Sequence, residues 1–222
     1  MSTKILFAGG GTAGHVEPAL AVASWLRSKK PEWQYQFIGT KTGLENQLVP
    51  EAGFELRHIP KVLMPRQLTP STLFWPVKIL IATWQGIKIC KDADLIIGFG
   101  GYACPPLYLA GAILRKPIFI HEANAIPGWA NKLGAPFASK IFIAFSRAGL
   151  KIGRWKNAIL SGMPIRAEII SSTFESKEVI STKRQAQLEK WRLSADKQTV
   201  LVFGGSLGSR HINEAILQYL AS

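Results

Sequence analysis

The chain carries the same short design near both of its ends: an apolar run, a glycine-rich turn and a segment with helical spacing of apolar residues. The first copy, at residues 4–29, is KILFAGGGTAGHVEPALAVASWLRSK, and the second, at residues 198–220, is QTVLVFGGSLGSRHINEAILQYL. A buried strand that turns through glycines directly into a helix is typical of the first unit of a parallel α/β sheet. Two copies therefore predict two α/β domains, the second represented only by its first strand and helix.

Short apolar runs alternate with helical patterns between the two copies. The predicted strands lie at residues 33–39, 54–60, 93–101, 117–122, 139–145 and 157–162. Runs such as LIIGF and IFIAF are apolar on both faces, as in a sheet covered by helices on both sides. We therefore expect an α/β fold with a doubly wound, Rossmann-like domain at residues 1–162. A linker and entry helix follow at 163–197, and a second Rossmann-like domain starts at 198–222.

The charge of the chain indicates a polyanionic partner. There are 27 Lys and Arg against 14 Asp and Glu, which gives a net charge of +13. Such a balance suits nucleic acid, an anionic membrane surface or phosphorylated small molecules. No zinc-ligand spacing or aromatic RNA-binding motif accompanies the basic residues, so nucleic acid is the least favoured of these partners.

Cysteine usage and hydropathy indicate a cytosolic protein. Cys90 and Cys104 have no metal-ligand or CxxC spacing, so we expect two reduced thiols. The apolar run at residues 4–8 passes straight into glycines, which does not resemble a signal peptide. No stretch reaches the roughly 18 apolar residues of a membrane-spanning helix. We expect a soluble protein that touches a membrane only at its surface.

The first glycine turn is predicted to bind a phosphorylated ligand. Gly9, Gly11 and Gly14 match GxGxxG between a strand and a helix. An NAD enzyme would carry an acid at the tip of the second strand, but that strand ends FIGTKTG, and the turn also lacks the GK[ST] of a P-loop. What stays is a set of backbone amides at a helix N-terminus, which suits a diphosphate. His15 follows directly and is a candidate acid or base, although capping or packing would also explain it.

Two further strands end in residues that suit ligand contact. The turn at Gly98 to Gly101, followed by Tyr102, ends one of them, although glycines there also let a helix pack closely. His121, Glu122 and Asn124 end the strand PIFI, where Asn124 would also serve as a helix cap. Cys104 has no base near it in the sequence, so we interpret it as a packing residue.

Residues 62–91 combine aromatic and basic side chains with no acid. This composition is typical of a segment that lies on anionic lipid, and it predicts a membrane contact. Ordinary packing of a crossover helix is the competing explanation. The predicted contact residues are Leu73, Phe74, Trp75, Ile79 and Trp84.

Five motifs, taken together, resemble the MurG family of glycosyltransferases over nearly the whole chain. They are GGGTAGHVEPALAVA, GFGGY, HEANAIPGWANKLGA, GMPIR and GGSLGSRHIN, and they occur in the family's order. The resemblance implies a GT-B fold, in which two Rossmann-like domains face each other across a cleft. The N-terminal domain would hold a lipid-linked acceptor, and the C-terminal domain most of UDP-N-acetylglucosamine.

The resemblance also implies roles for particular residues. His15 and Glu122 would be catalytic, and no metal or cofactor would be needed. The glycine loops that receive the acceptor and its phosphates would contribute Gly11, Gly100, Gly101 and Tyr102. The donor would be contacted by Thr12, Ala13, Gly14, Asn124, Arg166 and Ser206.

The implied enzyme is a hexosyltransferase of peptidoglycan synthesis, bound to the cytoplasmic face of the cell membrane. It would move N-acetylglucosamine, with inversion, from its UDP donor to the undecaprenyl-linked muramoyl-pentapeptide. Its partners would be these two substrates, anionic inner-leaflet lipid and other cell-wall synthesis proteins. Because much of the donor domain is not present, we expect the chain alone to be inactive. A non-catalytic membrane-binding fragment and, more weakly, an NAD-linked oxidoreductase are the alternatives.

Overall fold

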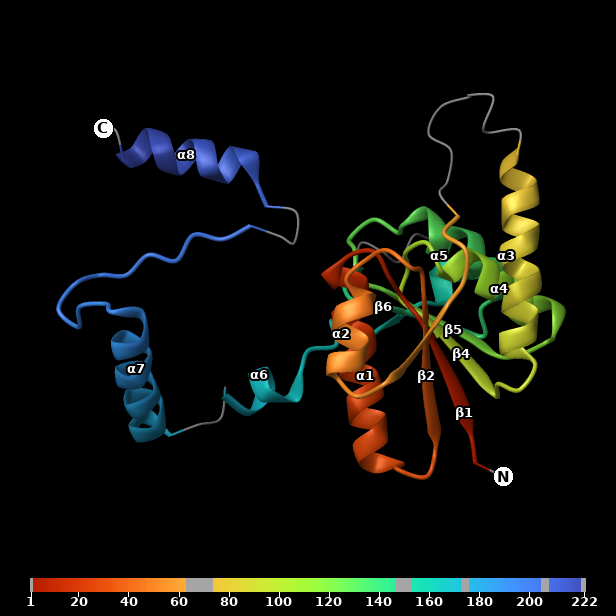
Figure 1. Cartoon of the computed structure of the whole chain (residues 1–222), viewed down its shortest axis with the longest axis horizontal. Coiled ribbons are helices and arrows are strands. Elements are labelled where there is room, and N and C mark those ends of the chain that lie inside the picture. Colours follow the sequence, from red (N-terminus) through yellow and green to blue (C-terminus); the bar gives the residue numbers. More distant parts are fainter. Residues whose placement is uncertain (1, 63–73, 147–152, 173–175, 205–207, 221–222) are drawn as a thin grey trace. The chain divides into compact units, whose positions relative to one another are not determined.

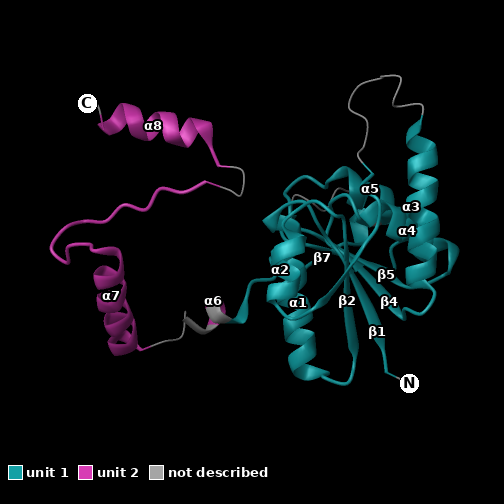
Figure 2. Ribbon diagram, viewed as in Figure 1, with its two compact units in different colours: residues 1–167 teal, residues 168–222 magenta. Residues whose placement is uncertain are grey.

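The computed structural model describes residues 2–62, 74–146, 153–172, 176–204 and 208–220 (Figure 1). The chain divides into two compact units, residues 1–167 and residues 168–222, shown in teal and magenta in Figure 2. Unit 1 contains the sheet and unit 2 contains helices and connecting segments. The predicted roles of residues 1–162 as the acceptor domain, 163–197 as a linker with an entry helix and 198–222 as the start of the donor domain stay predictions.

Unit 1 is built on a parallel sheet whose described strands follow the order β3-β2-β1-β4-β5-β6-β7. The chain begins at β1, an interior strand, runs outward to β3 at one edge, and then crosses back to β4 on the other side of β1 (Figure 1). The strands are β1 (Lys4–Ala8), β2 (Gln34–Gly39), β3 (Glu55–His58), β4 (Leu95–Gly98), β5 (Ile118–Glu122), β6 (Lys140–Ile143) and β7 (Ile159–Leu160). The reversal of direction opens a crevice at the carboxyl ends of β1 and β4, where such sheets bind ligands. The predicted doubly wound α/β fold is confirmed.

Alternate residues of β1 pack on opposite faces of the sheet. Ile5 and Phe7 share one core with α1 (Ala13–Lys29) and α2 (Glu45–Glu51). Leu6 and Ala8 share the other core with α3 (Trp75–Cys90), α4 (Cys104–Ile113) and α5 (Trp129–Gly134). Two short 3₁₀ helices, η2 (Ala135–Phe137) and η4 (Gly153–Asn157), complete the described part of this unit. Both faces of the sheet are therefore covered, as the apolar strands predicted.

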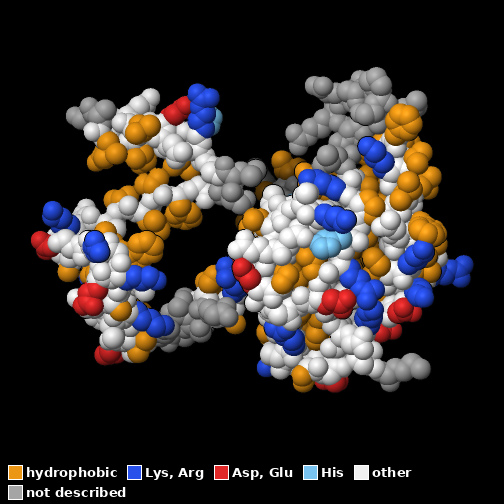
Figure 3. All heavy atoms as spheres, in the orientation of Figure 1, with side chains coloured by type: hydrophobic (Ala, Val, Ile, Leu, Met, Phe, Trp, Pro, Cys, Tyr) orange, Lys and Arg blue, Asp and Glu red, His pale blue; other side chains and the backbone are white. Residues whose placement is uncertain are grey.

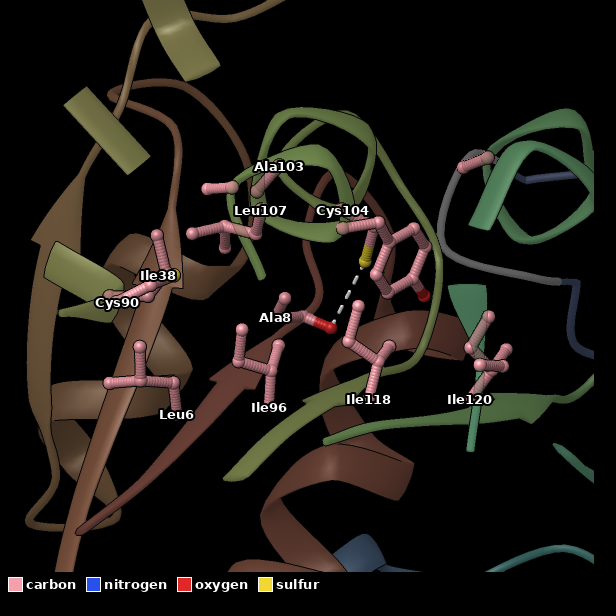
Figure 4. Packing of buried hydrophobic residues seen from close by; sticks show 14 of the residues in the cluster. Leu6, Ala8, Ile38, Cys90, Ile96, Ala103, Cys104, Leu107, Ile118 and Ile120 are labelled. Carbon is pink, nitrogen blue, oxygen red and sulfur yellow. Dashed lines mark hydrogen bonds between the residues drawn. The ribbon is translucent and has the colours of Figure 1, made fainter. Parts of the chain in front are cut away.

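Cys104 joins α4 to the end of β1. Its thiol donates to the carbonyl oxygens of Ala8, at 3.2 Å, and Gly100, at 3.1 Å; Figure 4 shows the first of these bonds as a dashed line. Burial raises the pKa of the Cys104 thiol to about 11. Both cysteines are buried and free. Cys104 is thus a packing residue, as expected from the sequence, and it has none of the thiolate character that a nucleophile needs.

Unit 2 contains α7 (Lys177–Trp191) and α8 (Arg210–Leu220), and α6 (Ala167–Ser172) spans the division between the units. The helices were predicted at the positions of α7 and α8. The predicted strand at residues 198–203 was wrong, because this segment forms no strand and leaves Val200 and Leu201 about four-fifths exposed. A strand needs a neighbour for its backbone hydrogen bonds, and the described part of unit 2 supplies none.

Within the described residues, no helix combines the length and the apolar character needed to cross a membrane.

Candidate active site

A cavity of about 160 Å³ lies at the carboxyl ends of β1, β4 and β5. Most of the residues predicted to form the site line it, which brings three separate sequence motifs together. The lining consists of Gly10, Gly11, Thr12, His15, Gly100, Gly101, Tyr102, Glu122, Asn124, Gly128, Trp129, Ala130 and Asn131.

His15, in the first turn of α1, is one of the residues that line this cavity. Its Nδ1 atom lies 3.2 Å from the Gly10 carbonyl oxygen and 3.2 Å from Thr12 Oγ1. The carbonyl can only accept a hydrogen bond, so Nδ1 carries the proton and donates it. The Nε2 atom then has a free lone pair, it packs beside Gly100, and within the described residues no hydrogen bond reaches it.

The surroundings of His15 keep its ring neutral. Burial lowers the pKa of His15 from its ordinary value of 6.5, while the Gly10 carbonyl and the carboxylates of Glu122 and Glu45 act in the opposite direction. A neutral imidazole with a free lone pair in a cavity is able to take a proton from a hydroxyl group. The arrangement therefore fits a general base.

The two glycine loops lie back to back. A side chain on Gly101 would collide with the backbone of Gly10, and one on Gly11 would meet the ring of Tyr102 at 3.4 Å. The Lys61 ammonium group lies 4.7 Å from the centre of that ring, so a cation stands beside the loops. Gly101 therefore permits a close approach that a side chain would block, and both Gly11 and Gly101 have a positive φ, near 90°, which favours glycine.

Some of the loop amides are not free for an anion, contrary to the simple cradle expected from the sequence. The Gly11 N–H group donates to Glu45 Oε2 at 2.8 Å, and the Gly100 N–H group donates to Cys104 Sγ at 3.2 Å. Ala13 and Gly14 lie in the first turn of α1, where backbone N–H groups have no acceptor within the helix. Anion binding at this loop would therefore depend on the start of α1.

Glu122 organises the loop that follows β5. Its Oε1 atom accepts hydrogen bonds from the backbone and side-chain nitrogens of Asn124 at 2.8 and 2.7 Å. Its Oε2 atom accepts from Gly128 N at 2.9 Å and Asn131 Nδ2 at 3.0 Å. The side chain is almost fully buried and its oxygens are occupied. Glu122 is thus better placed to hold the loop and to face His15 with a negative charge than to take a proton itself.

Sequence reasoning missed Asn131 and Tyr108. The Tyr108 hydroxyl donates to Asn131 Oδ1 at 2.8 Å, which turns the Asn131 amide nitrogen toward Glu122. Both side chains are buried, and the Tyr108 ring lies where a side chain on Gly98 or Gly134 would collide with it. In the sequence, the feature that could have indicated this pair was the presence of Gly98 and Gly134, which leave space for the Tyr108 ring.

Arg166, a predicted donor contact, reaches α1 in this structure. Its guanidinium group forms a two-pronged ion pair with Glu17, with N–O distances of 3.0 and 3.1 Å. His121, predicted beside Glu122, is buried and bonds through Nε2 to the Gly162 carbonyl oxygen at 3.0 Å. Ser206, another predicted donor contact, lies outside the described residues.

The residues predicted to touch a membrane lie on two different faces of the helix α3. Phe74 and Trp84 are about 60% exposed. Val77, Leu80 and Ile81 are also exposed, and Figure 3 shows hydrophobic side chains gathered over this helix. Ile79 is buried, so it does not lie on the surface, and Trp75 is partly buried against the same cluster. The helical period explains the correction, because residues 75, 79, 82 and 86 share the inner face. Leu73 lies outside the described residues.

Comparisons with known proteins agree with this fold. Residues 5–143 match the model of the glycosyltransferase family 28 N-terminal domain. A Thermobifida fusca protein, named UDP-N-acetylglucosamine–N-acetylmuramyl-(pentapeptide) pyrophosphoryl-undecaprenol N-acetylglucosamine transferase, is 42% identical over 96% of this chain and 54% of its own length. A Desulfitobacterium hafniense protein of the same name is 37% identical, over 98% and 58%. The crystal structure of Acinetobacter baumannii MurG aligns with a TM-score of 0.61 and 30% identity, over 75% of this chain and 46% of that one.

The chain thus spans little more than half the length of the curated relatives it matches. The family match covers most of unit 1, from β1 to the end of β6. The resemblance to MurG drawn from the five motifs is confirmed, and the chain belongs to glycosyltransferase family 28.

Proposed function

We propose that this chain is the acceptor-side part of a glycosyltransferase that moves N-acetylglucosamine from UDP-N-acetylglucosamine to a lipid-linked N-acetylmuramoyl-pentapeptide. The observation that carries the proposal is His15, which lines a cavity at the switch point of a family 28 fold and whose Nδ1 atom lies 3.2 Å from the Gly10 carbonyl oxygen, an arrangement that leaves Nε2 as the basic nitrogen. The names of the relatives supply the two substrates.

The chemistry is a single displacement with inversion. His15 Nε2 takes the proton from the acceptor's 4-hydroxyl group as its oxygen attacks the anomeric carbon of the donor sugar. The bond from that carbon to the UDP oxygen breaks, and UDP leaves with the electron pair. The positive end of α1, at Ala13 and Gly14, stabilises negative charge that develops on a phosphate nearby. The proposed reaction uses no cofactor and no metal ion.

Glu122 and its loop would prepare this site. Four hydrogen bonds hold its carboxylate, and the same bonds fix the backbone and side chain of Asn124 at the cavity. A negative charge near His15 also stabilises the imidazolium that forms when His15 takes the proton. Glu122 therefore supports the base in the proposed mechanism.

The exposed face of α3 would bring the protein to the acceptor. Its apolar side chains stand beside Lys78, Lys88 and Lys91, and the Lys88 ammonium group lies 3.3 Å from the centre of the Trp84 ring. An apolar stripe edged by lysines fits the surface of an anionic bilayer. We propose a peripheral location on the cytoplasmic side of the membrane, where other cell-wall synthesis proteins would also be within reach.

The test is transfer of labelled N-acetylglucosamine from its UDP donor to a lipid-linked muramoyl-peptide in detergent. The chain is assayed alone and with the C-terminal half of the Thermobifida fusca relative, produced separately. We expect transfer only in the pair and a loss of at least about 100-fold with His15→Ala. His58→Ala, which changes an exposed histidine at the end of β3, is the matched control and should keep the activity.

No transfer by a folded pair that still binds anionic vesicles would overturn the enzyme proposal in favour of a membrane-binding fragment. Equal activity of His15→Ala and His58→Ala would show that His15 is not the base. The proposal that the chain is part of a glycosyltransferase would still stand.

A further inference from the structure

One peptide group joins His15 to a buried carboxylate on another helix. The carbonyl oxygen of Gly10 accepts from His15 Nδ1 at 3.2 Å, and the N–H group of Gly11 donates to Glu45 Oε2 at 2.8 Å. The Gly10 carbonyl and the Gly11 N–H belong to the same planar peptide unit. A continuous chain of hydrogen bonds therefore runs from the carboxylate of Glu45, through this peptide, to the imidazole.

Glu45 sits in a pocket that is shaped for a carboxylate. Its side chain is fully buried, and Oε1 accepts from the Thr40 backbone N–H at 3.0 Å. The Thr40 hydroxyl lies 3.1 Å from Oε1 and shares its single proton between Oε1 and the Thr42 carbonyl oxygen, at 2.7 Å. A side chain on Gly10 or Gly39 would meet Glu45 atoms at 2.7 and 2.6 Å, and one on Gly43 would collide with it. A buried charge is tolerated when its oxygens are bonded in this way.

Such a chain has two effects on the imidazole. A peptide group fixed at its N–H end presents its carbonyl oxygen in one direction, so the His15 ring is held with Nδ1 protonated and Nε2 free. Hydrogen bonds in series also polarise one another, so the carboxylate increases the accepting power of the Gly10 oxygen. In other histidine-based sites a carboxylate bonded directly to Nδ1 does this work.

We infer that Glu45 is a positioning residue for His15 and acts on it through the Gly10–Gly11 peptide group. The inference about tautomer and orientation stands on the geometry of unit 1, and only its effect on rate rests on the proposed transferase function. Thr12 Oγ1, also 3.2 Å from Nδ1, serves as a second acceptor for the same proton.

A test must separate the effect of Glu45 on His15 from the effects of the other titratable groups around the ring. Glu45 from α2 and Glu122 from the end of β5 are the charged groups that act on its ring, and the Tyr102 phenol lines the same cavity from the loop after β4. A change at Glu45 must therefore be compared with a change of equal charge elsewhere on α2. Glu51, whose carboxylate accepts only from the Gln47 side chain in the described structure, provides it.

The experiment is an NMR measurement of the His15 tautomer, the His15 pKa and the exchange rate of the Gly11 amide proton. It is made on three ¹⁵N-labelled proteins: the unaltered chain, Glu45→Gln and Glu51→Gln. In the unaltered protein we expect the Nδ1–H tautomer of His15 and slow exchange of the Gly11 amide proton. In Glu45→Gln the removed charge should lower the pKa of His15, and the Gly11 amide should exchange at least about ten times faster. Glu51→Gln should match the unaltered protein in all three readouts.

The Nε2–H tautomer in the unaltered protein would overturn the inference, and this measurement decides the case even if Glu45→Gln does not fold. Identical tautomer, pKa and exchange in the two variants would overturn it as well. Neither outcome depends on transferase activity.

The effect on rate is measured in the reconstituted pair. Glu45→Gln should lower kcat about ten-fold with KM unchanged, and the acidic limb of the pH profile should move to lower pH. An inactive pair with the expected NMR behaviour would count against the proposed function and not against the Glu45–His15 connection. A fall in kcat with no movement of the acidic limb would mean that Glu45 supports only the fold.

Discussion

At the scale of single residues, the Tyr108 hydroxyl decides which way the Asn131 amide faces. Tyr108→Phe leaves Asn131 Oδ1 buried without its donor, so we expect a loss of about 1–3 kcal/mol in the free energy of unfolding. Urea denaturation measures it. The matched control is Tyr35→Phe, which removes a hydroxyl bonded at 2.7 Å to the exposed Lys30 carbonyl and should cost less than about 1 kcal/mol. Equal losses in the two variants would contradict this account.

The second residue-scale prediction concerns His121 and acid. Its Nε2 atom donates to the Gly162 carbonyl, its Nδ1 atom has no hydrogen-bond partner in the described residues, and burial lowers its pKa from 6.5. The unfolded chain therefore binds a proton more readily than the folded chain. Stability from this group is complete above pH 6.5 and falls as the pH drops from there toward the folded-state pKa.

We expect this histidine to contribute a slope of at most about 1.4 kcal/mol per pH unit in that window. Urea denaturation between about pH 7.5 and about pH 5 measures the slope. His121→Gln keeps a donor for Gly162 but does not titrate, so the slope should be smaller in this variant. Parallel curves for the two proteins would show that His121 is not a source of acid sensitivity.

At the scale of elements, one face of α3 packs on the core, and the opposite, exposed face is the one that we propose to bind the membrane. Trp84→Glu places a charge in the exposed apolar face, and we expect at least a ten-fold loss of binding to anionic phosphatidylglycerol vesicles. Trp25→Glu on α1 is the matched control, because Trp25 is exposed to a similar degree, 60% against 57%. Vesicle co-sedimentation measures both variants. If the two lose binding equally, α3 is not the docking helix.

The elements also show what the sequence can reveal about such a fold. The inner strands of unit 1, such as β1, β4 and β5, were predictable because apolar runs between glycine turns match strands that are buried on both faces. His15, Glu122 and the glycine loops were predictable because they follow the carboxyl ends of strands. The segment at 198–203 has the same apolar character and forms no strand, because pairing is a property of two segments.

Glu45 shows why the rest of the site could not be predicted. The segment LENQLVPE is typical of a solvated helix, and the acid lies 34 residues from the amide that it binds. Its burial depends on the absence of side chains at Gly10, Gly39 and Gly43, which come together only in the folded sheet. Long-range contacts of this kind leave no local periodicity in the sequence.

At the scale of the whole molecule, unit 1 contains its own cores. Their buried members lie between residues 5 and 155, whereas Leu188 is the buried hydrophobic residue in the described part of unit 2. We expect residues 1–167 alone to unfold cooperatively, with a Tm within about 2 °C of that of the full chain. Calorimetry on both chains measures it. A Tm lower by more than about 5 °C would show that unit 2 stabilises unit 1.

The position of β1 in the interior of the sheet, between β2 and β4, sets the order in which the protein can be completed during synthesis. β1 is made first, and one edge pairs with β2 soon afterwards, but the other edge waits for β4, which begins at Leu95. Until then the chain presents an open strand edge with apolar residues on both faces, which is a site for mispairing and for chaperones. His15 is likewise made early and acquires Glu122 late, so the cavity comes into existence only when the growing chain has passed α5.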